Sequence, residues 1–242
     1  MTRRNVDMGH DSLALVGAAG GVGTTRLTLE AGTLLARDGR DVAVLDAAYA
    51  TQGLADHTSG RIDPDVTALC LEDRPLEAGL LDRRLEAAGR LAVCPARAPF
   101  ERLARAKTPE AAEALEERIA EAERAFDRVL VDVPPVAANQ AVAAVSAADA
   151  VAVVADAARA TAVLPRARDR LVDVGVDPTA TVVTRTDGHP DADAVVPTLE
   201  AETPAVETDA EARTAVADVL AVTMDLSLEP QESGGLRERL PL

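Results

Sequence analysis

The chain has 242 residues, which is enough for one large α/β domain with a complete hydrophobic core. Its formal net charge is −16 at pH 7, and Lys107 is its only lysine. This acidity argues against a direct nucleic-acid partner, whose binding surface is normally basic, and the acidic, lysine-poor, alanine-rich composition favours a protein from the high-salt cytosol of a halophilic archaeon.

Apolar runs of strand length alternate with helical patterns along the chain. Several runs are apolar throughout, which is typical of parallel strands covered on both faces. The predicted strands are Leu13–Val16, Val42–Leu45, Leu91–Cys94, Val129–Val133, Val151–Ala155, Thr181–Thr184 and a short Ala205–Glu207. The predicted helices are Thr25–Arg37, Pro99–Lys107, Pro109–Ala125, Asn139–Ala147, Thr161–Val174 and Ala210–Leu220. The alternation predicts an α/β fold with a doubly wound, mostly parallel sheet of about seven strands and helices on both faces.

The remaining segments define the expected domain organisation. We expect a single domain over residues 12–226, with an N-terminal tail at 1–11 and a flexible C-terminal tail at 227–242. The segment Asp56–Arg90 is irregular and charged, so it is interpreted as an exposed subdomain or a lid over the site.

Neither the ends of the chain nor its cysteines indicate export, a membrane anchor or a metal. Met1–Arg4 leads into no apolar stretch, so no signal peptide is predicted, and no run approaches the length of a membrane span. The C-terminal Leu236–Leu242 is short, contains a proline and carries only two arginines, so it is not expected to bind a membrane. Cys70 and Cys94 lack metal-type spacing and are expected to be free thiols of a cytoplasmic protein.

A glycine-rich stretch, Gly17–Arg26, joins the first predicted strand to the first predicted helix. Strand, glycine loop and helix in this order are the context of a phosphate-binding loop, whose pattern is G-x-x-x-x-G-K-[ST]. The first glycine of that pattern falls on Ala18 and its lysine on Thr24, whereas Thr25 stands where a Mg²⁺-binding hydroxyl belongs. The stretch is therefore either a phosphate site that holds its ligand without the lysine or a tight turn that binds nothing.

The loop retains the groups that bind an anion through the backbone. Gly20, Gly21 and Gly23 allow positive φ, so that successive N–H groups can form a concave anion site at the start of a helix. Arg26 follows the loop directly in the sequence, and it either reaches a phosphate or is a solvated surface arginine.

Three further segments follow the glycine loop in order: Asp41–Ala48, Phe126–Pro135 and Ala147–Val154. With Gly20–Gly23, they make the chain resemble the ParA/MinD family of deviant P-loop ATPases over roughly residues 12–224. The resemblance implies an ATP-dependent sandwich dimer, a Mg²⁺ ion and slow hydrolysis tied to the positioning of cargo, chromosomes or division sites. We therefore expect a regulatory, positioning or scaffold factor with an unidentified protein as its partner, and the resemblance allows a homodimer.

The family's loop resembles K-G-G-x-G-K-[ST], and its glycines match the three glycines of the loop. Its signature lysine falls on Ala19 and its Walker lysine on Thr24, while the Mg²⁺-coordinating threonine matches Thr25. The predicted nucleotide- and phosphate-binding residues are Gly20, Gly21, Val22, Gly23, Thr24, Thr25 and Arg26.

At the ends of the other strands, the family pattern is only partly kept. The first Asp of the family's D-x-D matches Asp46, but the second, which helps to place the attacking water, falls on Ala48. The Walker B Asp, which binds Mg²⁺ through water, matches Asp132; its alternative role is to cap a nearby turn. An Asn that often touches the adenine falls on Thr184. The predicted Mg²⁺ residues are Thr25, Asp132 and Asp46.

The missing groups are those that phosphoryl transfer needs most. That reaction relies on positive charge and in-line positioning, and removal of a charge clamp lowers its rate by orders of magnitude. We therefore predict a pseudo-ATPase whose hydrolysis is absent or very slow; weak binding of ATP with Mg²⁺ and no nucleotide binding both stay open. The alternatives are a protein-interaction module that binds no nucleotide and an active ATPase rescued by Arg26 or by a residue of a partner.

Overall fold

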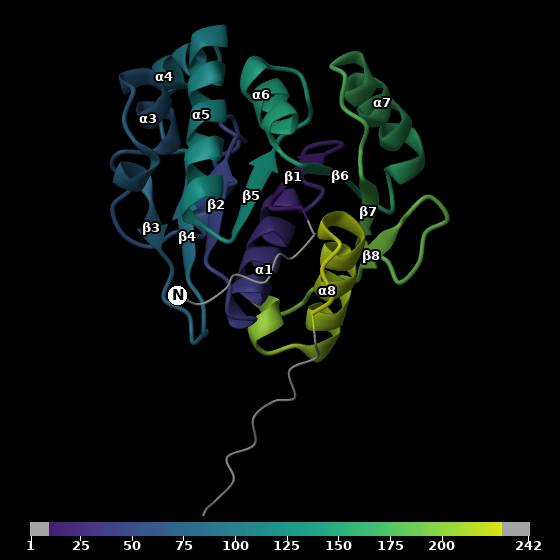
Figure 1. The fold of residues 1–242 in the computed structure, drawn as a ribbon. Helices are drawn as coiled ribbons and strands as arrows, with labels where there is room; N and C mark the ends of the chain where they lie inside the picture. Colours follow the sequence, from purple (N-terminus) through teal and green to yellow (C-terminus); the bar gives the residue numbers. More distant parts are fainter. Residues whose placement is uncertain (1–9, 229–242) are drawn as a thin grey trace, which may run out of the picture.

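The computed structural model describes residues 10–228 and contains one eight-stranded sheet between two layers of helices (Figure 1). The strands are β1 Ser12–Gly17, β2 Val42–Asp46, β3 Leu81–Asp82, β4 Leu91–Cys94, β5 Arg128–Val133, β6 Ala150–Asp156, β7 Ala180–Thr184 and β8 Ala194–Val196. Their order across the sheet is β3-β4-β2-β5-β1-β6-β7-β8, and every pairing is parallel except that of β3 with β4. The predicted doubly wound α/β fold is confirmed. The tails predicted at 1–11 and 227–242 lie almost entirely outside the described residues.

The helices form a layer on each face of the sheet. On one face, α1 Thr24–Arg37 and α8 Ala210–Met224 pack against each other. The other face carries α3 Val66–Glu72, α4 Phe100–Arg105, α5 Pro109–Ala125, α6 Asn139–Ala147 and α7 Ala160–Asp173 (Figure 1). Within residues 10–228, no helix combines the length and the hydropathy that crossing a bilayer requires.

The central strands are buried on both faces because their side chains alternate between the two helix layers. In β1, Leu13 and Leu15 pack into the core beneath α1 and α8, whereas Ala14 and Val16 pack into the core beneath α3 to α7. Runs that are apolar throughout therefore build two cores, and the polar residues of the site fall at the strand ends.

Helix α5 shows how local sequence sets an element. The Thr108 side chain accepts a hydrogen bond from the N–H of Ala111, and Pro109 occupies the first turn, where a missing N–H does no harm. The predicted bounds of this helix agree with the observed ones. Its buried apolar residues recur every three or four positions and include Ala111, Leu115, Ile119 and Ala122.

The prediction of a strand at Ala205–Glu207 is wrong, because these residues form a 3-10 turn, η2. The cause is Glu30, a buried residue of α1 whose carboxylate accepts from the N–H groups of Ala205 at 2.8 Å and Val206 at 2.9 Å. N–H groups that are already bonded to a side chain cannot join a strand ladder. The last parallel strand is instead β8, which pairs with β7.

The interpretation of Asp56–Arg90 as an exposed subdomain or a lid is also wrong. The segment contains α3, the 3-10 turn η1 Leu76–Gly79 and β3, which pairs with β4 at the edge of the sheet (Figure 1). Its charged residues are interspersed with apolar ones that are buried in the core, among them Val66, Leu69 and Leu76. Most charged residues of this segment therefore lie on its outer surface, whereas Asp65 is buried.

Replacement of Glu30 by alanine is expected to destabilise the fold, because two buried N–H groups lose their acceptor and Arg26 loses one of its contacts. We expect the free energy of unfolding, measured by urea denaturation at neutral pH, to fall by about 3 kcal/mol. The exposed Glu113→Ala variant on α5 is the control and should stay within about 0.5 kcal/mol of the wild type. Equal stability of the two variants would contradict the role given to Glu30.

Candidate functional site

The carboxyl ends of the central strands meet at one edge of the sheet. Strand β1 lies between β5 and β6, and the glycine loop follows it directly. Asp46, the last residue of β2, lies beside Asp132 of β5 in the parallel register. Doubly wound sheets bind their ligands at such an edge. The fold therefore brings the glycine loop together with the two aspartates that the sequence indicated.

The glycine loop has a backbone conformation that requires glycine. Gly21 has a φ of 75° and Gly23 a φ of 92°, both in the left-handed region. A Cβ added to Gly20, Gly21 or Gly23 would have no heavy atom of residues 10–228 within 4 Å, apart from the glycine itself and its two neighbours in the chain. The loop therefore borders open space. Because α1 begins at Thr24, the positive end of its dipole adjoins the loop. The loop thus keeps the features by which a helix N-terminus binds a phosphate.

Thr25 and Asp132 are in direct contact. The Thr25 hydroxyl donates a hydrogen bond of 2.5 Å to Asp132 Oδ2, and Asp132 is 1% exposed. The short helix α2 Gly53–Asp56 begins against this pair, since a Cβ on Gly53 would lie 3.1 Å from Thr25 Oγ1. Two residues that are distant in the chain therefore form one polar unit beside the glycine loop.

The oxygens of Thr25 and Asp132 fit a Mg²⁺ ion that is shared with a phosphate. Mg²⁺ prefers hard oxygen ligands and usually keeps waters and substrate phosphates beside one or two protein ligands. In the part of the chain that the structure describes, no three or more His, Cys, Asp or Glu side chains are arranged to hold a metal by themselves. The donor set therefore fits an ion that arrives with a nucleotide better than a permanent metal centre.

Asp46 is fully buried, and its two oxygens accept hydrogen bonds from the backbone N–H groups of Ala48 at 2.8 Å and Ala96 at 3.1 Å. Burial, and after it the charge of Asp132, raises the pKa of Asp46 to about 8. Burial also raises the pKa of Asp132 to about 6, against the opposing effect of the Thr25 hydrogen bond. A cation bound nearby stabilises the charged form of both carboxylates, so the pair favours cation binding.

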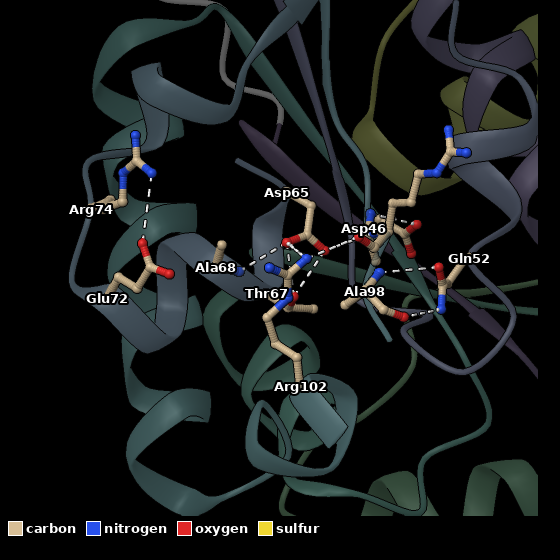
Figure 2. Close-up of polar contacts among 11 residues, drawn as sticks. Asp46, Gln52, Asp65, Thr67, Ala68, Glu72, Arg74, Ala98 and Arg102 are labelled. Carbon is tan, nitrogen blue, oxygen red and sulfur yellow. Dashed lines mark hydrogen bonds and ion pairs between the residues drawn. The ribbon is translucent and has the colours of Figure 1, made fainter. Parts of the chain in front are cut away.

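Figure 2 shows that Asp46 belongs to a polar network that fixes the segment after β4. Gln52 exchanges two hydrogen bonds with the backbone of Ala98, at 3.1 and 3.2 Å. Asp65, buried at the start of α3, accepts a hydrogen bond of 2.7 Å from the backbone of the same segment and pairs with Arg102 at 3.1 Å. Sequence reasoning missed Gln52 and Asp65; the one local signal was an aspartate before an apolar run, as at a helix N-cap. The network ties the segments after β2 and β4 together next to Asp46.

Arg26 makes contacts other than the predicted one. Its guanidinium donates to the carbonyl of Leu199 at 2.7 Å and to that of Ala201 at 2.5 Å, and its Nε lies 3.4 Å from Glu30. These contacts engage all three guanidinium nitrogens. The structure therefore gives Arg26 the role of fixing the segment before η2, which is neither the phosphate contact nor the solvated surface position considered from the sequence.

A cavity of about 100 Å³ lies beside the glycine loop, on the side of β7. Its lining comes from the loop, from α1, from the end of β7 and from β8 and the segment after it. The Thr184 hydroxyl donates to the carbonyl of Val22 at 2.8 Å, so this side chain holds the loop in place. In the family pattern, an asparagine that contacts the adenine stands at position 184. Here Thr184 has a shorter side chain, and its hydroxyl is already bonded to Val22.

The sequence profile of a family described as AAA domain matches residues 11–164. Among solved structures, the septum site-determining protein MinD of Pyrococcus horikoshii with Mg-ADP matches with a TM-score of 0.67 at 18% identity, over 86% of this chain and 93% of that chain. Cobyrinic acid a,c-diamide synthase of Mycobacterium smegmatis with bound ADP and magnesium gives 0.67 at 19% identity, over 88% and 95%. A chain of the MinC:MinD cell division protein complex of Aquifex aeolicus gives 0.58 at 24% identity, over 73% and 69%. No protein of curated function matches the sequence.

The raised pKa values predict that the protein without Mg²⁺ loses stability as the pH rises. Asp46 and Asp132 bind a proton more tightly in the folded chain than in the unfolded chain, so they favour the folded state at low pH, and this advantage is lost between about pH 4 and 8. Asp132→Asn removes the group with the pKa near 6. We expect the free energy of unfolding of this variant, relative to that of the wild type, to rise by about 3 kcal/mol between pH 4 and 7. The measurement is urea denaturation without Mg²⁺. A stability difference between the variant and the wild type that does not change with pH would show that burial does not raise the pKa of Asp132.

Proposed function

Because the chain belongs to the ParA/MinD family of P-loop ATPases, whose fold and AAA-domain profile it shares, we propose that it binds ATP or ADP with Mg²⁺ and works as a regulatory, positioning or scaffold factor. In this proposal a single domain over residues 12–226 carries the site, and the protein acts in the cytoplasm. The phosphates occupy the loop Gly20–Thr25, and ATP is hydrolysed very slowly or not at all.

The hydrogen bond between Thr25 and Asp132 is the observation that carries the proposal. It places a hydroxyl and a buried carboxylate, both suited to Mg²⁺, directly beside a loop whose N–H groups can hold a phosphate. A turn that binds nothing has no need of a second buried carboxylate at the same place, and Asp46 is paired in register with Asp132. The arrangement is therefore explained best by a ligand that carries both a metal ion and phosphates.

The same site lacks the groups that accelerate hydrolysis. Ala19 and Thr24 stand where the family has its two lysines, and Ala48 stands where the family has the carboxylate that places the attacking water. Ala48 is buried, and its N–H is bonded to Asp46, so this position contributes backbone only. Transition-state charge then has no lysine to stabilise it, which supports a binding protein over an efficient ATPase.

The solved relatives support a nucleotide and a protein partner for this fold. MinD of Pyrococcus horikoshii holds Mg-ADP, and the cobyrinic acid a,c-diamide synthase holds ADP with magnesium. In Aquifex aeolicus, MinC and MinD form a cell division protein complex. We infer that this chain likewise presents its nucleotide state to another protein, as a monomer or a homodimer.

Isothermal titration calorimetry with Mg-ADP and Mg-ATP in molar KCl tests nucleotide binding. We expect saturable binding that weakens by about tenfold or more when Mg²⁺ is chelated or when Thr25→Ala or Asp132→Asn is introduced, because the metal links the phosphates to both residues. Thr214→Ala, at an exposed position of α8, is the matched control and should bind as the wild type does. The midpoint of thermal unfolding should rise with nucleotide concentration, because the ligand binds only the folded chain.

Two results would replace the proposal by its alternatives. No binding at millimolar nucleotide leaves a protein-interaction module without a ligand. Turnover in molar KCl clearly above that of an Asp132→Ala variant indicates an active ATPase.

Thr24→Lys restores a cation at the position where the phosphate-loop pattern has its lysine. We expect this variant to bind Mg-ADP about tenfold more tightly than the wild type, because a lysine ammonium adds a point charge next to the phosphates. Thr24→Gln has a side chain of similar length without the charge and is the control. An equal gain in both variants, measured by the same calorimetry, would mean that the loop does not bind phosphate through charge.

A further inference from the structure

Two arginines that the sequence analysis did not single out hold the glycine loop by its carbonyl groups. Arg159, directly before α7, donates from Nη2 to the carbonyl of Gly20 at 3.1 Å. Arg185, directly after β7, donates from Nη2 to the carbonyl of Gly21 at 3.0 Å. Their side chains are 44% and 53% exposed, so both reach the solvent at the edge of the loop.

Asp156 braces both arginines. It is the last residue of β6, and its side chain is 5% exposed. Its Oδ2 accepts a hydrogen bond of 2.7 Å from Nε of Arg159, and its Oδ1 accepts one of 3.0 Å from the backbone N–H of the same residue. Nη1 of Arg185 lies 3.8 Å from Oδ2. The hydrogen bond from Arg159 lowers the pKa of Asp156, so the carboxylate stays charged and keeps the two guanidinium groups beside the loop.

A guanidinium that binds a carbonyl also acts on the N–H at the other end of the same peptide unit. In a trans peptide the C=O and the N–H point in opposite directions, so the carbonyl of Gly20 shares its unit with the N–H of Gly21, and the carbonyl of Gly21 with that of Val22. A hydrogen bond at one end polarises the unit and strengthens its other end as a donor. The two arginines thus make two consecutive N–H groups of the loop better anion donors, and together with the charged Asp156 they leave one net positive charge next to it.

No lysine of the loop supplies positive charge for a phosphate. Residues 19 and 24 are Ala and Thr, and the guanidinium of Arg26 is bonded to carbonyls of the segment before η2. The overall charge of the chain is −16, so a phosphate is repelled unless positive charge is concentrated at the site. Arg159 and Arg185 provide such a concentration at the Gly20–Gly21 turn.

We propose that Arg159 and Arg185, braced by Asp156, are the phosphate-binding cations of this protein and take the place of the two missing lysines. The inference rests on the proposed nucleotide binding and assigns the charge on which that binding depends. The ligand class is a nucleoside di- or triphosphate, recognised at its phosphates through the polarised loop.

The test is calorimetric titration of the wild type, Arg159→Gln, Arg185→Gln and the double variant with Mg-ADP and with Mg-pyrophosphate. We expect each single substitution to weaken both ligands by about tenfold and the double variant by about a hundredfold. Pyrophosphate has neither base nor ribose, so equal losses for the two ligands place the effect on the phosphates. Arg124→Gln makes the same change in net charge at an exposed residue near the end of α5 and should bind as the wild type does.

A lysine variant separates charge from geometry. Arg159→Lys keeps the positive charge but loses the planar fork that contacts Asp156 and Gly20 together, so its affinity is expected to lie between those of the wild type and Arg159→Gln. Thermal unfolding tests whether each variant is folded. If one glutamine variant does not fold, the affinities of Arg159→Lys and of the glutamine variant at the other arginine test the inference.

The two ways of failing are distinct. Wild-type affinity in both glutamine variants of a protein that does bind Mg-ADP overturns the inference and leaves the proposed function standing. No binding by the wild type overturns the proposed function and the inference with it.

Discussion

The site depends on two carboxylates that the sheet places side by side. The parallel register of β2 and β5 puts Asp46 next to Asp132, and both are buried. Buried like charges are poorly solvated and repel each other, which explains the raised pKa of Asp46; burial alone accounts for that of Asp132. Backbone N–H groups after β2 and β4 and the hydroxyl of Thr25 donate to this pair. The conformations of three segments around the site therefore follow from one feature of strand register.

The fold was predictable where short stretches of sequence determine it, and not where distant residues do. Apart from Arg128 at its start and Asp132 near its end, the strand β5 is apolar and it follows a charged helix, so its type and position could be inferred without knowledge of its neighbours. Ala205–Glu207 has an equally plausible strand composition, but the buried carboxylate of Glu30 captures its N–H groups from α1. Likewise, only the packing of α3 against α5 shows that the charged segment around Asp65 belongs to the core.

The site was predictable to the extent that its residues end strands. Thr25 and Asp132 are 107 positions apart, yet both could be assigned to one location, because the glycine loop after β1 leads to Thr25 and Asp132 lies near the carboxyl end of the neighbouring β5. For the cations, nearness in sequence was misleading: Arg26 adjoins the loop but contacts the segment before η2. Arg159 follows β6, which lies beside β1 in the sheet, and Arg185 follows β7, the next strand out. Strand order, and not distance along the chain, decides which arginines reach the loop.

Positive charge that acts through a fixed loop favours holding a phosphate over transferring it. In the proposed site, Arg159 and Arg185 are bonded to loop carbonyls, so their effect is similar for a bound nucleotide and for its transition state. Interactions that are equally strong in both states tighten binding without raising the rate of the chemical step. The rate depends on charge and water placement matched to the transition state, and in the proposed function those are the groups that Ala19, Thr24 and Ala48 replace. A protein of this design would change state through nucleotide exchange, and its partner would read which nucleotide is bound.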